Sequence, residues 1–464
     1  MEDATIYALG TPTPSRAAPG AISVIRLSGP RAPDALIFLT EPKAFQRGHS
    51  ARDPALPEPR RMVVRALLDP ETGEEIDRGL VVWFEAPNSE TGETMAELHL
   101  HGGRAVIAAL LAALGEIEGL RLAEPGEFTR RAFESGRLDL TAVEGLGDLI
   151  FAETEAQRAQ ALRQYSGALA ACVEAWRTRL IEALALVEAR IDFSDEADVP
   201  EELLAPAIHA ARQLIDEIEE TLRDERRGER LREGLVVAIA GPPNAGKSSL
   251  LNRLAQREAA IVSPYAGTTR DVIEVHLDLA GYPVTLLDTA GIRPSDDPVE
   301  QEGVRRAEER AASADLVLWV VDVRDAEEEG SCKANITVKD YFIIHNKVDL
   351  FEIKDETTPR PDSRNFAVSA KLGTGIESLI AALAAYAEAS LSGAESALVT
   401  RERHRIALQD TAAALRRAVA EGPESEDLVA EELRLAARSL GRLTGRVDVE
   451  DVLDVIFRDF CIGK

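Results

Sequence analysis

The sequence predicts a multidomain protein that combines α/β and all-helical parts. Three observations support this: a length of 464 residues, a change from β-rich to helical composition near residue 138, and alternating strands and helices from residue 232. At about 150 residues per domain, this length is enough for about three domains with hydrophobic cores. Hydrophobic residues make up 45% and charged residues 29% of the chain, which excludes a disordered or fibrous protein.

The first predicted segment, residues 1–137, is an α+β domain. Short β-rich runs are separated by Pro and Gly, as in Thr11-Pro12-Thr13-Pro14 and Ala86-Pro87-Asn88. One apolar helix is expected over residues 104–117. The expected strands cover residues 21–27, 62–68, 80–84 and 97–100.

The remaining chain divides into three further segments. Residues 138–231 are rich in Ala, Leu, Glu and Arg, and a break near residues 191–200 divides them into at least two long helices. Residues 232–384 alternate short apolar strands with helices, which is typical of a doubly wound sheet. Residues 385–464 are helical again, so the α/β domain is inserted into a discontinuous helical domain. The expected strands of the inserted domain cover residues 235–240, 273–279, 284–287, 316–321, 341–344 and 366–368.

Charge and cysteine content limit the compartment and the partners. The formal net charge of −28 makes the electrostatic field of the whole protein negative, which excludes nucleic-acid binding through that field. Any RNA contact must therefore be local. Cys172, Cys332 and Cys461 lie far apart and form no CxxC pair, which fits a reducing compartment. The start lacks a basic and apolar signal sequence, and no apolar run reaches the ~20 residues of a membrane helix. We expect a cytoplasmic protein with no membrane partner.

A glycine-rich loop carries the first nucleotide motif. Residues 241–248 read Gly-Pro-Pro-Asn-Ala-Gly-Lys-Ser, which fits G-x-x-x-x-G-K-[ST] between an apolar strand and a helix. Glycines let the backbone approach phosphate oxygens, and the first N–H groups of a helix bind anions. We expect the Lys247 ammonium to bind the β- and γ-phosphates and the Ser248 hydroxyl to ligate Mg²⁺. The predicted contacts of this loop are Asn244, Ala245, Gly246, Lys247, Ser248 and Ser249.

Three later motifs, each weak alone, complete a guanine-nucleotide site. Asp288-Thr289-Ala290-Gly291 follows a strand, where a carboxylate can hold the Mg²⁺ shell and a glycine N–H can approach the γ-phosphate. Asn346-Lys347-Val348-Asp349 follows another strand, and Asp349 can accept from guanine N1–H and N2–H₂, a donor pair that adenine lacks. Ser369-Ala370-Lys371 would close over the base. The order and spacing of these motifs match a GTPase of the translation-factor-related class.

The usual side chain for orienting the attacking water is absent. Ile292 follows the 288–291 motif, where Ras-like enzymes place a glutamine. Residues 263–269, Ser-Pro-Tyr-Ala-Gly-Thr-Thr, can serve as switch I with Ser263 near the nucleotide and Thr268 or Thr269 on Mg²⁺. A solvated charged segment is the alternative explanation for the acidic candidates that could position the water. These are Asp296, Asp297, Glu300 and Glu302.

Ordered motifs along nearly the whole chain resemble one family. The chain ends in Phe460-Cys461-Ile462-Gly463-Lys464, and its GTPase motifs are inserted between helical segments. Together with these features, the remaining motifs resemble the tRNA-modification GTPase family MnmE, also called TrmE. They are Arg26-Leu27-Ser28-Gly29, Pro87-Asn88-Ser89, Glu97-Leu98-His99-Leu100-His101-Gly102-Gly103, Pro125-Gly126-Glu127-Phe128, Leu138-Asp139-Leu140, Ile191-Asp192-Phe193 and Leu231-Arg232-Glu233-Gly234.

The resemblance implies ligands for both ends of the chain. The N-terminal domain resembles a tetrahydrofolate-binding module that also dimerises and that binds a 5-formyl-tetrahydrofolate-type one-carbon donor. Glu300 matches the glutamate that orients the attacking water, and Cys461 would lie near the one-carbon chemistry in an undecided role. Arg137 stands where relatives can carry lysine, which keeps the charge but changes the donor geometry. The implied sets are Arg26, Glu97, Arg137 and Lys464 for folate, Asn244, Ser263, Tyr265 and Thr268 for K⁺, and Ser248 and Thr269 for Mg²⁺.

The resemblance also implies a reaction and partners. A potassium-dependent GTPase cycle would drive a 5-carboxymethylaminomethyl-type modification of the wobble uridine of certain tRNAs. The flavin-dependent protein MnmG, also called GidA, would join the homodimer in a heterotetramer-type complex. A non-catalytic GTP-gated scaffold in ribosome assembly is the alternative, and the GTPase motifs do not separate the two. The N-terminal domain and the tail of residues 460–464 favour the tRNA-modifying enzyme.

Overall fold

The chain folds into two units, Met1–Gly147 with Gly441–Lys464, and Asp148–Leu440. The predicted division into four segments stays a prediction, and it does not anticipate that the last 24 residues, Gly441–Lys464, group with the N-terminal part. One contact between these parts of the chain is an isolated antiparallel β-bridge that Ile462 forms with Pro125. The computed structural model describes all residues except 1–3, 15–19, 43–55, 193–203, 225, 257–259, 262–273, 289–313, 325–339, 351–363, 422–424, 448–452, 454–455, 459, 461 and 464.

A six-stranded sheet forms the centre of the first unit, in the order β3-β4-β5-β2-β1-β6. Neighbouring strands are antiparallel except for β1 and β6, which are parallel. Alternation places Leu27, Val81 and Leu98 on one face, where they are buried in the core. The strands are β1 (Thr5–Leu9), β2 (Ile22–Ser28), β3 (Val63–Leu68), β4 (Glu75–Phe84), β5 (Met95–His101) and β6 (Leu120–Leu122).

Helices cover that buried face of the first sheet. Side chains of α1 (Ala32–Thr40) and α3 (Arg104–Gly115) complete the same hydrophobic cluster. The expected helix over 104–117 is confirmed as α3, whereas α1 and β1 were not anticipated. α4 (Glu127–Glu134) contributes Phe128 to a smaller cluster with Ile6 and Met95. α5 (Leu140–Phe151) then leads along the chain into the second unit.

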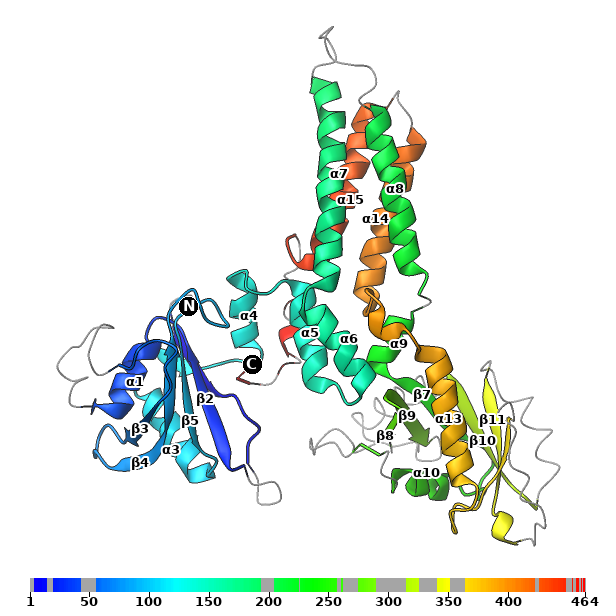
Figure 1. Ribbon diagram of the computed structural model, residues 1–464, viewed down its shortest axis with the longest axis horizontal. Helices are drawn as coiled ribbons and strands as arrows, with labels where there is room; N and C mark the ends of the chain where they lie inside the picture. The colour runs from blue at the N-terminus through cyan, green and yellow to red at the C-terminus, as the bar shows by residue number, and fades with distance from the viewer. Residues whose placement is uncertain are drawn as a thin grey trace, which may run out of the picture. The chain divides into compact units, whose positions relative to one another are not determined.

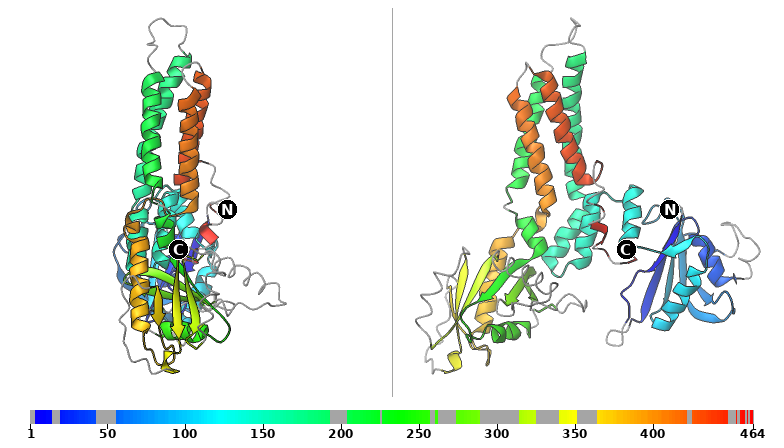
Figure 2. Two further views of the ribbon diagram at one scale, coloured as in Figure 1. Left: turned by 90° about the vertical axis from the view of Figure 1, so that its right-hand side faces the viewer. Right: turned by 180° about the vertical axis from the view of Figure 1, so that it is seen from behind.

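Long helices make up much of the second unit. Figures 1 and 2 show α7, α8, α14 and α15 running side by side. Buried residues of α7 recur every three or four positions from Leu169 to Val187, which is the spacing of one helix face. No described helix is long and apolar enough to span a membrane. The helices are α6 (Glu155–Tyr165), α7 (Ala168–Asp192), α8 (Leu204–Leu222), α9 (Arg227–Glu233), α14 (Glu402–Glu421) and α15 (Glu426–Thr444), with the short η4 (Ala394–Ser396).

The second sheet has the order β12-β11-β10-β7-β9-β8. All neighbours are parallel except β8, which is antiparallel to β9. Among the described residues, α10 (Lys247–Ala255) and α13 (Ile376–Leu391) pack on one face of this sheet (Figure 1). The strands are β7 (Leu235–Ala240), β8 (Glu274–Leu279), β9 (Tyr282–Asp288), β10 (Leu316–Asp322), β11 (Tyr341–Asn346) and β12 (Asn365–Ala367).

The parallel register gathers functional groups at one edge of this sheet. Ile239 pairs with Asp288, and Asp322 pairs with Asn346, so both pairs lie at the carboxyl ends of their strands. Ligands of open α/β sheets bind in the crevice outside these ends, where the strand order reverses. β7 lies between β10 and β9, so the loop that follows β7 is at this position.

Candidate functional site

The phosphate loop connects the end of β7 to the start of α10. Gly241 and Gly246 have φ angles of +136° and +97°, which L side chains rarely adopt. A Cβ at Gly241 would lie 2.1 Å from the carbonyl oxygen of Val320, and one at Gly246 would lie 2.2 Å from Nδ2 of Asn346. Both positions therefore favour glycine, because the β10 backbone lies close to Gly241 and the hydrogen-bonded Asn346 side chain lies close to Gly246.

The Lys247 ammonium is turned back onto this loop. Its Nζ donates to the carbonyl oxygens of Gly241 at 2.7 Å and Pro242 at 2.8 Å. Burial lowers the pKa of Lys247, and the Asp288 carboxylate opposes that shift. A bound phosphate would offer anionic oxygens to the same ammonium, so Lys247 is placed to exchange its carbonyl partners for phosphate.

Ser248 and Asp288 form a pair of oxygen donors beside the loop. The Ser248 hydroxyl donates to Oδ2 of Asp288 at 2.7 Å. Asp288 ends β9 and is fully buried, whereas Ser248 lies in the first turn of α10. Hydroxyl and carboxylate oxygens are the hard ligands that Mg²⁺ combines with water and phosphate oxygens. The pair therefore fits a Mg²⁺ site.

Asn346 joins the phosphate loop to residues 369–371, the predicted guanine loop that would close over the base. Its Nδ2 donates to the Ala245 carbonyl oxygen at 2.8 Å, and its Oδ1 accepts from the Ala370 N–H at 3.1 Å. The Ser369 hydroxyl donates to Oδ1 of Asp349, in the short helix η3 (Val348–Leu350), at 2.6 Å. The carboxylate predicted to recognise guanine is therefore oriented by the loop predicted to close over the base.

Asp322, at the end of β10, is a residue that sequence reasoning missed. Lys347 donates from Nζ to Oδ2 of Asp322 and to the Asn244 carbonyl oxygen, each at 2.7 Å. Arg324 donates to both carboxylate oxygens, at 3.0 and 2.6 Å. The hydrogen bond from Arg324, aided by Lys347 and opposed by burial, holds the pKa of Asp322 well below its usual range. The available signal was a carboxylate directly after an apolar strand, as at Asp288.

Part of the predicted site lies outside the described residues. Of the predicted K⁺ set, Asn244 alone is described. Ser249 and Lys371 are described and exposed. The predicted residues outside the described part of the chain are Ser263, Tyr265, Thr268, Thr269, Thr289, Ala290, Gly291, Glu300, Cys461 and Lys464.

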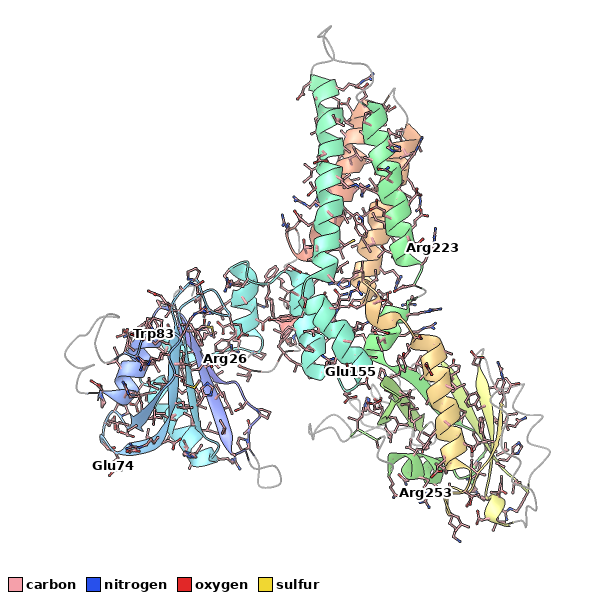
Figure 3. The ribbon with its side chains drawn as sticks, in the orientation of Figure 1. Arg26, Glu74, Trp83, Glu155, Arg223 and Arg253 are labelled. Carbon is pink, nitrogen blue, oxygen red and sulfur yellow. The ribbon has the colours of Figure 1, made fainter. Side chains whose placement is uncertain are left out.

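The N-terminal candidate site is centred on Arg26 of β2, labelled in Figure 3. Its side chain is 12% exposed, and its guanidinium lies 5.4 Å from the centroid of the Phe128 ring. Nε lies 3.5 Å from Oε1 of Glu97, its register partner on β5, and Nη2 pairs with Glu90. Burial lowers the pKa of Arg26, and Glu97 opposes that shift. Arg26 is therefore a nearly buried cation with acidic partners on two sides.

The C-terminal tail reaches the same strands. Arg26 donates from Nη1 to the Gly463 carbonyl oxygen at 3.5 Å, across 437 positions of sequence. A Cβ at Gly463 would lie 2.3 Å from the Leu9 carbonyl oxygen of β1. Arg137 donates from Nε and Nη2 to the Ser89 carbonyl oxygen, at 3.2 and 3.0 Å, next to Glu90. The structure thus brings Arg26, Glu97 and the tail together, and links Arg137 through the loop at Ser89.

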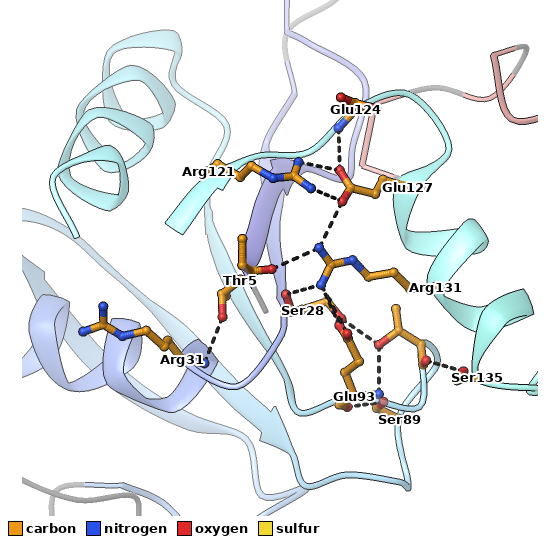
Figure 4. Close-up of polar contacts among 12 residues, drawn as sticks. Thr5, Ser28, Arg31, Ser89, Glu93, Arg121, Glu124, Glu127, Arg131 and Ser135 are labelled. Atoms are coloured by element: carbon orange, nitrogen blue, oxygen red, sulfur yellow. Dashed lines mark hydrogen bonds and ion pairs between the residues drawn. The ribbon is translucent and has the colours of Figure 1, made fainter. Parts of the chain in front are cut away.

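A charged network that sequence reasoning missed supports this loop (Figure 4). Arg131 of α4 donates to Oε2 of Glu93 at 2.9 Å and to Oε1 of Glu127 at 3.0 Å. Arg121 donates to Oε2 of Glu127 at 2.8 Å, and Ser28 donates to Oε2 of Glu93 at 2.7 Å. Burial raises the pKa of Glu127, but hydrogen bonds from Arg121, the Glu124 N–H and Arg131 leave it lowered. Glu127 and Arg131 are an i,i+4 pair on α4, whereas Glu93 and Arg121 lie on other segments, so no motif links all the partners.

Comparison with known proteins assigns the family. The model of the MnmE helical domain matches residues 140–461, and that of the GTP-binding protein TrmE N-terminus matches residues 5–137. A tRNA modification GTPase MnmE from Bradyrhizobium sp. (strain ORS 278) is 56% identical over 100% of this chain and 99% of its own. Those of Parvibaculum lavamentivorans (strain DS-1) and Rhodopseudomonas palustris (strain BisB18) are 55% and 54% identical.

These alignments cover nearly the full length of this chain and of each relative. The Parvibaculum relative is covered over 100% and the Rhodopseudomonas relative over 99% of its length, each by 99% of this chain. A solved structure, the G domain of the T. maritima FeoB iron transporter, aligns with 33% of this chain at 25% identity, with a TM-score of 0.24. The family predicted from the motifs is confirmed: the chain belongs to the tRNA modification GTPases MnmE.

Proposed function

We propose that this chain hydrolyses GTP and uses the GTPase cycle in the modification of tRNA. The observation that carries the proposal is that the parts of the nucleotide site are hydrogen-bonded together. Lys247 bonds the phosphate loop, the Ser248 hydroxyl donates to Asp288, and the Ser369 hydroxyl donates to Asp349. Adenine has no donor pair for Asp349, so the base is guanine. The tRNA part rests on the names of the relatives, which are tRNA modification GTPases.

We expect the phosphates to bind at groups that already line the loop. Lys247 leaves the carbonyl oxygens of Gly241 and Pro242 and binds the β- and γ-phosphate oxygens. The N–H groups at the start of α10 face the same anion. Ser248 and Asp288, with the predicted Thr269, would hold Mg²⁺, which neutralises charge on the β- and γ-phosphates when bound.

The proposal includes K⁺ and a water-orienting glutamate. Ile292 stands where a glutamine would orient the water, and the resemblance to the family gives this role to Glu300. The Asn244 carbonyl oxygen already accepts from Lys347, so its exposed side chain is the group available to K⁺, with Ser263, Tyr265 and Thr268. We expect faster GTP turnover in KCl than in NaCl at matched ionic strength, and loss of this difference in Asn244→Ala. Equal wild-type rates in the two salts would contradict the K⁺ site.

We further propose that the N-terminal site binds a 5-formyl-tetrahydrofolate-type donor through Arg26, Glu97, Arg137 and Lys464. Arg26 now pairs with Glu90, whose side chain is 48% exposed, so a folate carboxylate or pterin edge would compete with Glu90 for the guanidinium. Arg26→Gln should abolish folate binding in calorimetry, whereas Glu90→Gln should preserve or strengthen it. GTP hydrolysis should be unchanged in both variants, and folate binding by Arg26→Gln would show that the site is misplaced.

Homodimerisation through the first unit is part of the proposal. The sheet face opposite α1 and α3 carries exposed apolar side chains: Ile22 is 67%, Val64 59% and Leu80 38% exposed. Val64 and Leu80 are register partners, so they form a continuous patch. Such a patch supports a second copy as its partner. Val64→Lys should shift the chain from dimer to monomer in analytical ultracentrifugation, and a dimer that persists would place the interface elsewhere.

The remaining partners proposed are tRNA and the flavoprotein MnmG, with modification of the wobble uridine as the outcome. Mass spectrometry of wobble nucleosides after gene deletion tests this directly. Loss of a 5-carboxymethylaminomethyl-type nucleoside is expected. An unchanged nucleoside profile together with abnormal ribosomal subunits would instead favour the alternative, a GTP-gated scaffold in ribosome assembly.

A further inference from the structure

Arg253 connects the phosphate-binding helix to the predicted guanine loop. It lies in the last turn of α10, the helix that begins with Lys247 and Ser248, and is labelled in Figure 3. Its Nε donates to the Ala370 carbonyl oxygen at 2.8 Å, and its Nη2 donates to the Lys371 carbonyl oxygen. The two acceptors belong to consecutive residues, so one planar guanidinium holds both peptide groups.

The same peptide segment is held from its opposite side by the phosphate loop. Asn346 accepts from the Ala370 N–H at 3.1 Å and donates to the Ala245 carbonyl oxygen at 2.8 Å. Ala370 therefore has its N–H bound through Asn346 to the phosphate loop and its carbonyl bound by Arg253 of the following helix. One side of this clamp is Arg253 of the phosphate-binding helix, and the other is Asn346 of β11, which also bonds the phosphate loop.

We infer that Arg253 is a positioning residue for guanine-nucleotide affinity, acting through the Ala370–Lys371 backbone. The inference rests on the proposed GTP-binding function. A loop already fixed against α10 loses less conformational freedom when the base binds, so the nucleotide is held more tightly. Arg253 belongs to none of the nucleotide motifs, and the contact joins residues 117 positions apart. Its hydrogen-bond acceptors are the backbone carbonyl oxygens of Ala370 and Lys371, so we expect it to change nucleotide affinity and not the chemical step.

The test compares Arg253→Ala with wild type in the full chain, using fluorescent mant-GDP and a non-hydrolysable mant-GTP analogue. We expect the Kd of both nucleotides to rise by a similar factor of about five, since hydrogen bonds from a charged donor are lost and the effect is indirect. The rise should come from faster dissociation. kcat at saturating GTP should stay unchanged. Arg253→Lys should recover only part of the affinity, because an ammonium lacks the two-donor fork.

Asn252→Ala is the matched control, because Asn252 is the exposed neighbour on the same helix and its replacement should change nothing. Three results would each overturn the inference. They are unchanged dissociation rates in Arg253→Ala, a loss of affinity confined to the GTP analogue, and a lower kcat with unchanged Kd. If Arg253→Ala does not fold, Arg253→Gln gives the same test with a similar chain length. A wild-type chain that binds no mant-GDP would overturn the proposed function itself, which is a separate result.

Discussion

The two candidate sites differ in what holds their side chains. In the nucleotide site, Lys247, Lys347 and Asn346 donate mainly to backbone carbonyl oxygens of a glycine-rich loop. In the N-terminal site, charged side chains hold one another: Arg26 pairs with Glu97, and Arg131 joins Glu93 to Glu127. The first arrangement depends on backbone conformation, whereas the second depends on pairing charges that have little contact with water.

This difference teaches where a substitution should have its effect. Loss of a side chain from the nucleotide site leaves the loop backbone in place, so binding should change more than stability. Loss of one partner from the N-terminal network leaves carboxylates that have little contact with water and one cation fewer to balance them, so stability should change first. Four substitutions test this contrast, in order of decreasing expected effect.

Arg131→Ala should have the largest effect, a loss of about 3 kcal/mol of local stability in the first unit, at the low end for a broken buried pair because Glu127 keeps Arg121 as a partner. Faster amide hydrogen exchange in β1 and α4 would report the loss. Arg78→Ala is the control, because the Arg78–Glu75 pair is exposed to solvent and its loss should barely change stability. Equal effects of the two substitutions would remove the contrast between the sites.

Gly246→Ala should weaken nucleotide binding by about a hundredfold, because the φ of +97° is strained for alanine and the new methyl group meets Nδ2 of Asn346. Gly373→Ala is matched in backbone strain, with φ of +86°, but its Cβ meets no atom within 4 Å. Calorimetric titration with GDP should therefore separate them. Near-wild-type affinity in Gly246→Ala would show that the close approach is not needed.

Asp349→Asn should lower GTP affinity by about ten- to a hundredfold, because a charge-assisted pair to guanine is lost. The variant should also bind xanthine nucleotides better than the wild type does. Competition titrations with GTP and XTP measure both effects. Because Ser369 still reaches the replaced side chain, no change in thermal stability is expected, in contrast to Arg131→Ala. Equal GTP affinity in the two proteins would contradict the assignment of the base site.

The smallest effect concerns pH. The folded-state pKa of Glu127 is lowered from 4.5, so its contribution to stability is present above about pH 4.5 and is lost as pH falls through the folded-state value. Glu127→Gln should flatten this acid dependence of stability in the first unit, measured by unfolding at pH 3 to 7. An equally steep acid dependence in the variant would assign it to other carboxylates.

The convergence of the predicted nucleotide residues follows from the sequence, because these residues belong to contiguous motifs that come after expected strands. The strand expected over 235–240 is confirmed as β7, and the strands before Asp288 and Asn346 are also confirmed. Parallel strands place their carboxyl ends together, so the motif residues had to converge once the strands were recognised. Asp322 also follows an apolar run, but its pairing with Lys347 joins two different strand ends and is not marked in the sequence.

The sequence by itself determined the GTPase motifs, the helical segments on either side of them and the family. Only the tertiary structure decided that Gly463 lies against Arg26, that Arg131 of α4 reaches Glu93, and that Arg253 holds the predicted guanine loop. The physical reason is the range of the interactions. Motifs and helix periodicity act over a few residues, whereas these contacts join elements that only folding brings within hydrogen-bond distance.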